Sequence, residues 1–210
     1  MIKGIFKKLI SVLTICILLV VSSGCSGKEA KDVSQETPDL SGHTQVQIEM
    51  ESGDKMVFEL YPEYAPETVS NFINLVNEKF YDGLTFHRII KGFMIQGGDP
   101  SGNGSGGSDK KIKGEFSENG FTQNTLSHTR GVISMARSQD PDSASCQFFI
   151  MHDDQYASQL DGKYAAFGKL ISGEETLDKL ADTPVTMDKS SGEVSSPEEK
   201  VVIKSITLLK

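Results

Sequence analysis

The sequence contains no tryptophan, only three cysteines among 210 residues, and fewer basic than acidic residues. Three cysteines are too few for a disulfide scaffold. The 21 lysine and arginine residues against 29 aspartate and glutamate residues give a net charge of −8. This balance argues against a nucleic-acid-binding protein, because such proteins present a basic face. A chain of this length can bury a full hydrophobic core without a metal or disulfide, so we expect one domain of ordinary size.

Signatures of several enzyme classes are missing as well. The sequence has no GxxxxGK[ST] phosphate loop and no GxSxG nucleophile motif. Its four histidines form no HExxH or other close pair, so we expect no metal site and no cofactor. The pattern Gly102-x-Gly104-x-x-Gly107 has the letters of a dinucleotide-binding loop. It does not open a helix within a βαβ unit, so we expect no dinucleotide there.

The N-terminus has the pattern of an export signal. Three lysines within the first eight residues precede an uncharged apolar run over residues 9–21, which is too short to span a membrane as a mature helix. Small residues follow, and then Cys25, so that VVSSGC resembles a bacterial lipobox. That motif usually has leucine three positions before the cysteine, where this chain has Ser22. We expect residues 1–24 to be a signal peptide and Cys25 to carry lipid; plain cleavage leaving a free Cys25 is the alternative.

Loss of residues 1–24 would leave 18 basic and 29 acidic residues. A body so acidic does not bind anionic lipid through its charge, so we expect the acyl chains on Cys25 to anchor it to a bacterial membrane outside the cytoplasm. Residues 25–42 are polar and rich in serine, glycine and charge, which predicts a flexible tether. We expect residues 43–210 to form the folded domain, as a monomer, with Cys146 as a small buried residue rather than a nucleophile.

Apolar residues alternate with polar ones over 46–50 and 56–60, with a turn between them, which predicts a β-hairpin with one buried face. Pro66 and the spacing of Val69, Phe72, Ile73 and Val76 predict a helix. A second short helix fits 174–181, and residues 182–199 are expected to be a polar loop. Further strands are predicted over residues 84–90, 131–136, 147–152, 165–170 and 201–208. Many short strands, two helices and no βαβ rhythm indicate an antiparallel barrel or sandwich.

Four segments carry the functional information. They are FHRIIKGFMIQGGD at 86–99, GVISMA at 131–136, SCQFFI at 145–150 and LDGKYAAFG at 160–168. In this order and spacing, they resemble the cyclophilin family of peptidyl-prolyl cis-trans isomerases over the whole domain. The resemblance implies a mainly β fold, a closed eight-stranded antiparallel barrel capped by two α-helices.

The resemblance also implies the site. Arg88 and Gln96 would be catalytic, with Gln96 orienting the arginine, and Ala136 and Arg137 would form the floor of the groove, Arg137 through its backbone. The remaining residues expected to bind substrate are Phe93, Met94, Gln147, Phe149, Leu160 and Tyr164. Tyr164 replaces a histidine of the family. Gln159 stands where many members have the tryptophan that helps to bind cyclosporin-type peptides, which leaves this chain's drug sensitivity open.

These residue types suit isomerisation of an X–Pro bond. No bond is broken, but amide resonance sets a rotational barrier of about 18–20 kcal/mol. A guanidinium can weaken that resonance by donating a hydrogen bond to the prolyl nitrogen, and an apolar pocket can hold the ring. We therefore expect an isomerase acting on proline-containing segments of secreted or cell-surface proteins. Two alternatives stay open: a proline-peptide binding or chaperone module without essential turnover, and a sugar- or nucleotide-binding barrel using the glycine-rich loop.

Overall fold

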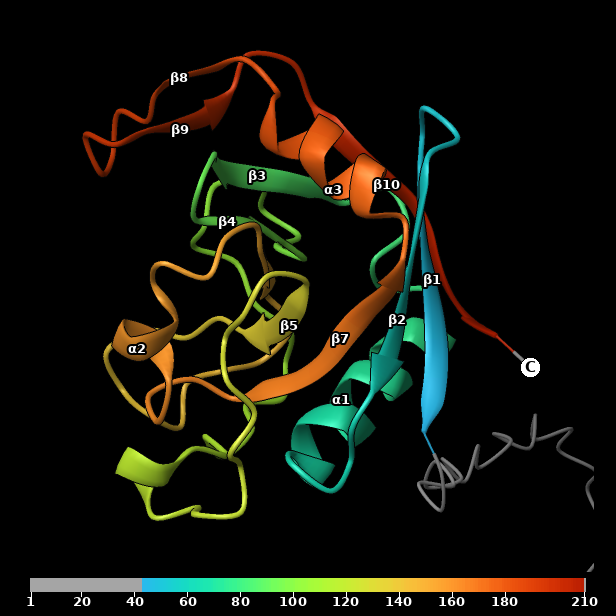
Figure 1. Cartoon of the computed structure of the whole chain (residues 1–210). Helices are drawn as coiled ribbons and strands as arrows, with labels where there is room; N and C mark the ends of the chain where they lie inside the picture. The colour runs from blue at the N-terminus through green and yellow to red at the C-terminus, as the bar shows by residue number, and fades with distance from the viewer. Residues whose placement is uncertain (1–42, 210) are drawn as a thin grey trace, which may run out of the picture. The chain divides into compact units, whose positions relative to one another are not determined.

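Eight strands close into an antiparallel barrel in the computed structural model, which describes residues 43–209 (Figure 1). The order around the barrel is β1-β10-β3-β4-β6-β5-β7-β2, which confirms the predicted fold class. The barrel strands are β1 Thr44–Met50, β2 Lys55–Leu60, β3 Thr85–Ile90, β4 Met94–Gly97, β5 Val132–Met135, β6 Phe148–Met151, β7 Ala166–Ser172 and β10 Val201–Leu209. The predicted signal peptide, lipidated Cys25 and tether lie outside the described residues and stay predictions.

The first two strands form the hairpin that alternation predicts. β1 and β2 pair from Thr44 with Leu60 to Glu49 with Lys55. Val46, Ile48 and Met50 are buried, as are the alternate residues of β2. Because successive side chains of a strand point to opposite faces, one buried face per strand fixes the register. The turn between them uses Gly53 at a φ of 88°, a left-handed conformation that glycine adopts without strain.

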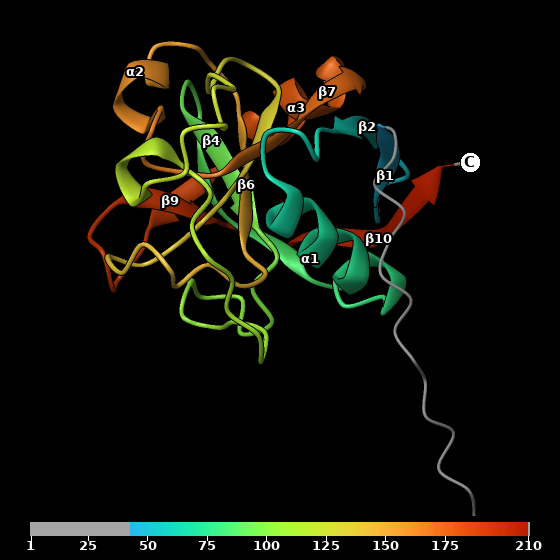
Figure 2. The same cartoon turned by 90° about the horizontal axis from the view of Figure 1, so that it is seen from below.

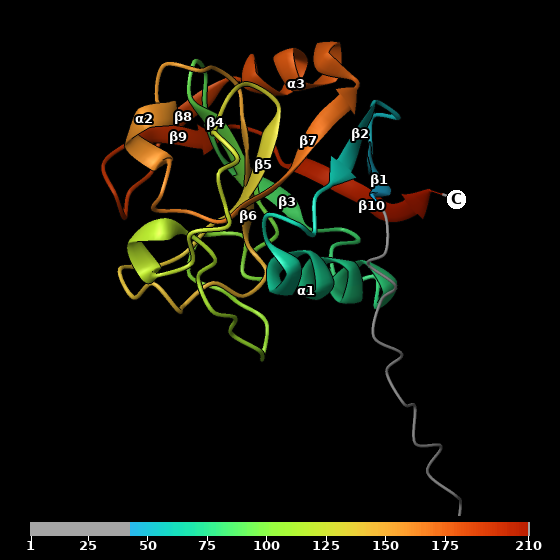
Figure 3. The ribbon, with the colours of Figure 1, turned by 60° about the horizontal axis from the view of Figure 1, so that its bottom comes forward.

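Helices α1 (Pro66–Asn77) and α3 (Glu174–Ala181) lie on opposite sides of the barrel (Figures 1 and 3). Proline occupies the first turn of α1, and the four apolar residues predicted from spacing are all buried. Helix α3 buries Leu177 and Leu180 in the same way. Each helix thus covers barrel surface with one apolar stripe. A third helix, α2 (Ala157–Leu160), is a single turn of four residues, and a 3-10 turn covers Ser117–Asn119.

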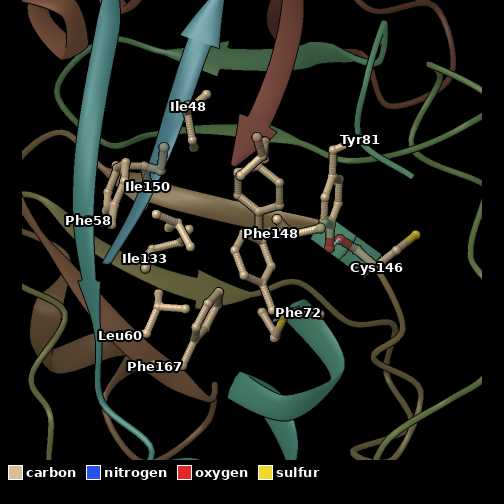
Figure 4. Packing of buried hydrophobic residues seen from close by; sticks show 14 of the residues in the cluster. Ile48, Phe58, Leu60, Phe72, Tyr81, Ile133, Cys146, Phe148, Ile150 and Phe167 are labelled. Atoms are coloured by element: carbon tan, nitrogen blue, oxygen red, sulfur yellow. Dashed lines mark hydrogen bonds between the residues drawn. The ribbon is translucent and has the colours of Figure 1, made fainter. Parts of the chain in front are cut away.

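Aromatic rings fill the barrel on its α1 side (Figure 4). The Phe148 ring lies edge-on to the rings of Phe72, Tyr81 and Phe86, at centroid distances of 5.6, 5.5 and 5.9 Å. The Tyr81 hydroxyl donates to the backbone oxygen of Cys146 at 3.0 Å, so its polar atom is satisfied inside the core. Burial raises the pKa of the Cys146 thiol, whose side chain is inaccessible; this confirms the expected packing role.

One prediction is wrong. Part of the expected polar loop over 182–199 forms an antiparallel hairpin of β8 (Val185–Met187) and β9 (Val194–Pro197). Its strands are only three and four residues long and bury little apolar surface, since Met187 and Val194 are 63% and 55% exposed. The turn is held instead by the Asp188 carboxylate, which accepts hydrogen bonds from the backbone of Ser190 and Ser191. β9 packs against β3, and Figure 2 shows the hairpin on the opposite side of the barrel from α1.

Within residues 43–209, no helix combines the length and apolar character needed to cross a membrane.

Candidate active site

A second apolar cluster lies apart from the main core. Its buried members are Met94, Val132, Phe149, Met151 and Ala166. Neighbouring residues on β6 divide between the two clusters, since Phe148 belongs to the main core and Phe149 to the second. Alternation along the strand therefore places one phenylalanine in the barrel core and the next against a different set of side chains.

This second cluster borders a cavity of about 130 Å³. The residues around it are Arg88, Phe93, Met94, Gln96, Ala136, Arg137, Phe149, Leu160 and Tyr164. All nine were named as site residues from the sequence, and the structure brings them together from four segments of the chain. An apolar cavity of roughly 150 Å³ can hold a benzene ring, so this one is of the right size for the smaller ring of proline.

Gln147 lies beside this cavity rather than in its wall. It borders a larger, more polar cavity of about 430 Å³, together with the glycine-rich loop. Its amide donates to the backbone oxygens of Gly104 and Gly106 at 3.1 and 2.7 Å. Its side-chain oxygen accepts from Gln96 Nε2 at 3.0 Å. Gln147 thereby connects Gln96 to the loop.

Arg88 stands at the polar end of the apolar cavity. It pairs with Gln96 across β3 and β4, and its Nη1 donates to Gln96 Oε1 at 3.3 Å. The same nitrogen lies 3.9 Å from Met94 Sδ, and the guanidinium carbon lies 5.9 Å from the centre of the Phe93 ring. On its other side the guanidinium donates to both carboxylate oxygens of Glu193, from Nε at 2.7 Å and from Nη2 at 3.0 Å.

The Arg137 guanidinium is held by other groups of the protein, so it is not a second free cation at the cavity. Its Nε and Nη2 donate to the backbone oxygen of Lys163 at 3.0 and 2.9 Å. The guanidinium also lies over the rings of Phe116 and Tyr164, at 5.1 and 4.7 Å from their centres. Stacking of this kind is typical of arginine, whose planar group is weakly hydrated. The cation therefore holds the Tyr164 wall in place.

A serine, a histidine and an aspartate form a hydrogen-bonded row behind Phe149. Asp161 Oδ1 lies 2.8 Å from His128 Nδ1, and His128 Nε2 lies 2.9 Å from Ser134 Oγ. The His128 ring stacks on Phe149 at 5.9 Å between ring centres. This row has the connectivity of a hydrolase triad, but Ser134 is completely buried. Because no substrate can reach that hydroxyl, the row supports the cavity wall.

The charge state of that row fits a supporting role. Burial lowers the pKa of His128, and this outweighs the opposing effect of the Asp161 hydrogen bond and charge. Burial alone would raise the pKa of Asp161, but hydrogen bonds from His128 and Ser127 outweigh it and lower that pKa. At neutral pH the row therefore holds a neutral imidazole against an ionised carboxylate.

The glycine-rich loop uses its backbone donors internally. The buried carboxylate of Asp99 accepts from the amides of Ser101, Asn103 and Gly104 at 2.8, 3.0 and 2.6 Å. A phosphate-binding loop needs such amides free to point at the ligand. Here the loop encloses its own anion, which argues against the nucleotide-binding reading. No cluster of three or more histidine, cysteine or acidic side chains suited to a metal occurs in the described part of the chain.

No sequence pattern identifies Asp99, His128 or Glu193 as a residue of the site. Asp99 ends the 86–99 segment, but no sequence signature predicts that the glycine-rich loop wraps around its carboxylate. His128, Ser134 and Asp161 are separated in sequence and meet only in the fold. Glu193 lies 105 residues from Arg88, within the segment expected to be a loop, so no local pattern joins the two.

Comparison with known proteins identifies relatives over the whole domain. A family model described as cyclophilin type peptidyl-prolyl cis-trans isomerase/CLD matches residues 45–208. Peptidyl-prolyl cis-trans isomerase B of Bacillus subtilis is 47% identical over 136 residues, which cover 65% of this chain and 90% of that protein. A putative peptidyl-prolyl cis-trans isomerase of Staphylococcus aureus is 37% identical over 191 residues, covering 79% of this chain and 91% of that protein.

Solved structures agree. The crystal structure of a Cryptosporidium parvum cyclophilin type peptidyl-prolyl cis-trans isomerase is similar at a TM-score of 0.69 and 33% identity, covering 80% of this chain and 99% of that one. A second structure of that protein, determined in the presence of the dipeptide Ala-Pro, gives a TM-score of 0.68 and 34% identity, covering 79% of this chain and 99% of that one.

Proposed function

From the premise that the chain belongs to the cyclophilin family and is a peptidyl-prolyl cis-trans isomerase, we propose that Arg88 is its catalytic residue. The observation that carries this assignment is the position of Arg88 Nη1. This nitrogen donates a hydrogen bond to Gln96 Oε1 and lies 3.9 Å from the sulfur of Met94, which lines the 130 Å³ cavity. A proline ring held in that cavity would present its nitrogen beside a charged N–H donor.

The proposed chemistry is a hydrogen bond that strengthens as the amide twists. In the planar amide the nitrogen lone pair is shared with the carbonyl, whereas in the twisted form it is localised and accepts a proton donor well. Arginine has five N–H groups, and Glu193 and Gln96 engage three of them. A remaining N–H on Nη1 faces the weak acceptor Met94 Sδ, which a substrate nitrogen would displace.

This arrangement can supply the rate acceleration that an isomerase needs. Free X–Pro bonds isomerise in roughly 10–100 s, so turnover in milliseconds needs at least about 10⁴-fold acceleration, or about 5.5 kcal/mol. A preorganised donor aimed at a transition state contributes about 3–4 kcal/mol. Selective binding of the twisted form would supply the rest.

The other assigned residues hold the substrate. We assign Phe93, Met94, Phe149 and Leu160 to the proline pocket, supported by their place around one cavity. We assign Gln96 to orientation of Arg88 and Gln147 to the wall beyond it. Ala136 and Tyr164 would complete the groove, with Arg137 contributing its backbone because its guanidinium is turned toward Lys163. Since one chain supplies this whole lining, we propose that the protein works as a monomer.

A proline-peptide isomerisation assay tests the assignment. Arg88→Ala should lower kcat/KM by at least about 10²-fold, or about 2.7 kcal/mol, and Arg88→Lys should restore little because a lysine lacks the fork of donors. The Arg88 side chain is one-third exposed, so both variants should fold. Activity of Arg88→Ala within twofold of wild type would disprove the proposed mechanism. A wild-type chain that binds proline peptides without accelerating their isomerisation would favour the chaperone alternative.

We further propose that the enzyme acts outside the cytoplasm on proline-containing segments of exported proteins, held at the membrane by lipid on Cys25. The support is the basic, apolar and small-residue pattern of residues 1–25. In the host bacterium, the full chain should label with palmitate and sediment with membranes, and Cys25→Ser should do neither. A Cys25→Ser chain that still sediments with membranes would show that another feature holds it there.

A further inference from the structure

The hairpin formed by β8 and β9 brings a carboxylate to the catalytic arginine. Glu193 Oε2 accepts from Arg88 Nε at 2.7 Å, and Oε1 accepts from Nη2 at 3.0 Å. Two parallel N–H···O bonds between planar groups form the bidentate geometry that fixes orientation as well as distance. The side chains of Arg88 and Glu193 are each about one-third exposed, so the pair lies at the edge of the site. Both residues also border a polar cavity of about 680 Å³.

The hairpin is built to present this carboxylate. The turn closes through Asp188, whose backbone amide donates to the backbone oxygen of Glu193 at 2.7 Å. Hydrogen bonds from Ser190 and Ser191 lower the pKa of Asp188 to about 2, so this turn keeps its acceptor at all physiological pH values. β9 packs on β3, the strand that carries Arg88. The carboxylate is therefore attached to a structured element beside the arginine.

Arg88 is consequently held from two sides. Gln96 holds Nη1 through one bond of 3.3 Å, and Glu193 holds Nε and Nη2. A single long hydrogen bond cannot fix the plane of a guanidinium on a flexible side chain, whereas the bidentate pair can. With both anchors present, the donor left at the cavity is on Nη1, beside Met94. Catalysis by one donor needs such a fixed position, since small misplacements cost large factors in rate.

We propose that Glu193 is a positioning residue of the isomerase, which fixes the Arg88 guanidinium so that Nη1 faces the prolyl nitrogen. This inference rests on the proposed catalytic role of Arg88. The opposite effect of this carboxylate would be inhibition: it would offset the positive charge of the Arg88 guanidinium and occupy N–H donors that a substrate would otherwise use. The two effects predict opposite changes in rate when the carboxylate is removed.

The test compares Glu193→Ala, Glu193→Gln and the control Glu199→Ala in the full chain. Glu199 is exposed and follows the same hairpin, so its removal changes the net charge by the same amount. We expect Glu193→Ala to lower kcat about 10-fold with KM within twofold of wild type. Glu193→Gln keeps one acceptor oxygen and should lose only about threefold. Glu199→Ala should match wild type.

A second readout follows the arginine itself. In wild type and in Glu199→Ala, the Nε–H signal of Arg88 in ¹⁵N–¹H spectra should be sharp and slow to exchange, because Glu193 accepts that proton. In Glu193→Ala it should broaden or exchange rapidly. In an Arg88→Ala background, Glu193→Ala should have no further effect on kcat, because the residue to be positioned is gone.

The outcomes separate this inference from the assignment on which it rests. If Arg88→Ala loses at least 100-fold while Glu193→Ala equals or exceeds wild type in kcat, the positioning role is overturned and the catalytic role of Arg88 stands. An unchanged Nε–H signal in Glu193→Ala would also overturn it. If Arg88→Ala itself keeps wild-type activity, both the catalytic assignment and the positioning role fail.

Discussion

Phe148 and Phe149 are neighbours on β6, and replacing each with alanine should separate the stability of the barrel from the affinity of the cavity. Phe148 is completely buried among core rings, and Phe149 is 5% exposed at the cavity wall. Removing a buried phenylalanine costs about 3–5 kcal/mol. For a domain of this size, 1 kcal/mol corresponds to about 2–4 °C in Tm, so the lower limit of 3 kcal/mol corresponds to a fall of roughly 6–12 °C for either variant.

The effect on substrate should differ. Phe149→Ala removes one wall of the proposed proline pocket, worth about 1–2 kcal/mol of apolar contact with the ring, so KM should rise about 5–30-fold. Phe148→Ala removes no cavity wall, and the folded enzyme should keep a KM within about twofold of wild type. Phe149→Leu retains much of the apolar surface and should fall between wild type and Phe149→Ala.

The assay is proline-peptide isomerisation at a temperature at least 15 °C below each variant's Tm, with Tm measured on the same samples by circular dichroism. This arrangement keeps unfolded protein from imitating weak binding. Equal changes of KM in Phe148→Ala and Phe149→Ala would refute the division of β6 into a core face and a pocket face. An unchanged KM in a folded Phe149→Ala would show that Phe149 is not a wall of the substrate pocket.

Three further predictions concern residues around the site. Burial lowers the pKa of His128, so the unfolded chain binds its proton more readily; the free energy of unfolding from urea titrations should be highest above about pH 6.5 and fall as the pH decreases toward the folded-state pKa, with a smaller fall in His128→Gln. Gln159→Trp should tighten inhibition by cyclosporin about 10-fold, a gain of packing and one oriented donor, while kcat/KM stays within twofold; equal inhibition constants would show that position 159 does not set drug sensitivity. Gly173 has a φ of 94°, and a Cβ there would lie 2.2 Å from the Lys55 backbone oxygen, so Gly173→Ala should cost at least about 2 kcal/mol in thermal unfolding.

Local patterns predicted the parts of the fold whose stabilising contacts are local or periodic. The alternation of β1 and β2 and the helical spacing from Val69 to Val76 are visible in the sequence because one face of each is buried. The hairpin of β8 and β9 packs on β3 but buries little apolar surface, since Met187 and Val194 are exposed. It is held by polar contacts of Asp188 with nearby serines, and the same residue types are equally common in irregular loops.

The cavity lining was predicted through family motifs, and the contacts behind it were not. Nine motif residues surround one cavity, but the stacking of His128 on Phe149 and the pairing of Glu193 with Arg88 join distant segments. Such contacts depend on the closure of the barrel, which no window of sequence contains. Propensity and periodicity describe single elements, whereas these pairs are properties of how elements meet.

The distribution of reactive groups in this structure follows from the reaction. Isomerisation forms and breaks no covalent bond, so a nucleophile in the pocket would bring no advantage. Accordingly, the Cys146 thiol is buried with a raised pKa, and the Ser134 hydroxyl lies behind Phe149. The proposed mechanism needs one donor held in a fixed position beside an apolar cavity. Strands β3 and β4 supply Arg88 and Gln96 from a rigid barrel, and Glu193 approaches from outside it. If Glu193 positions Arg88 as proposed, changes confined to the β8–β9 hairpin will alter the rate of isomerisation while leaving the barrel and the 130 Å³ cavity intact.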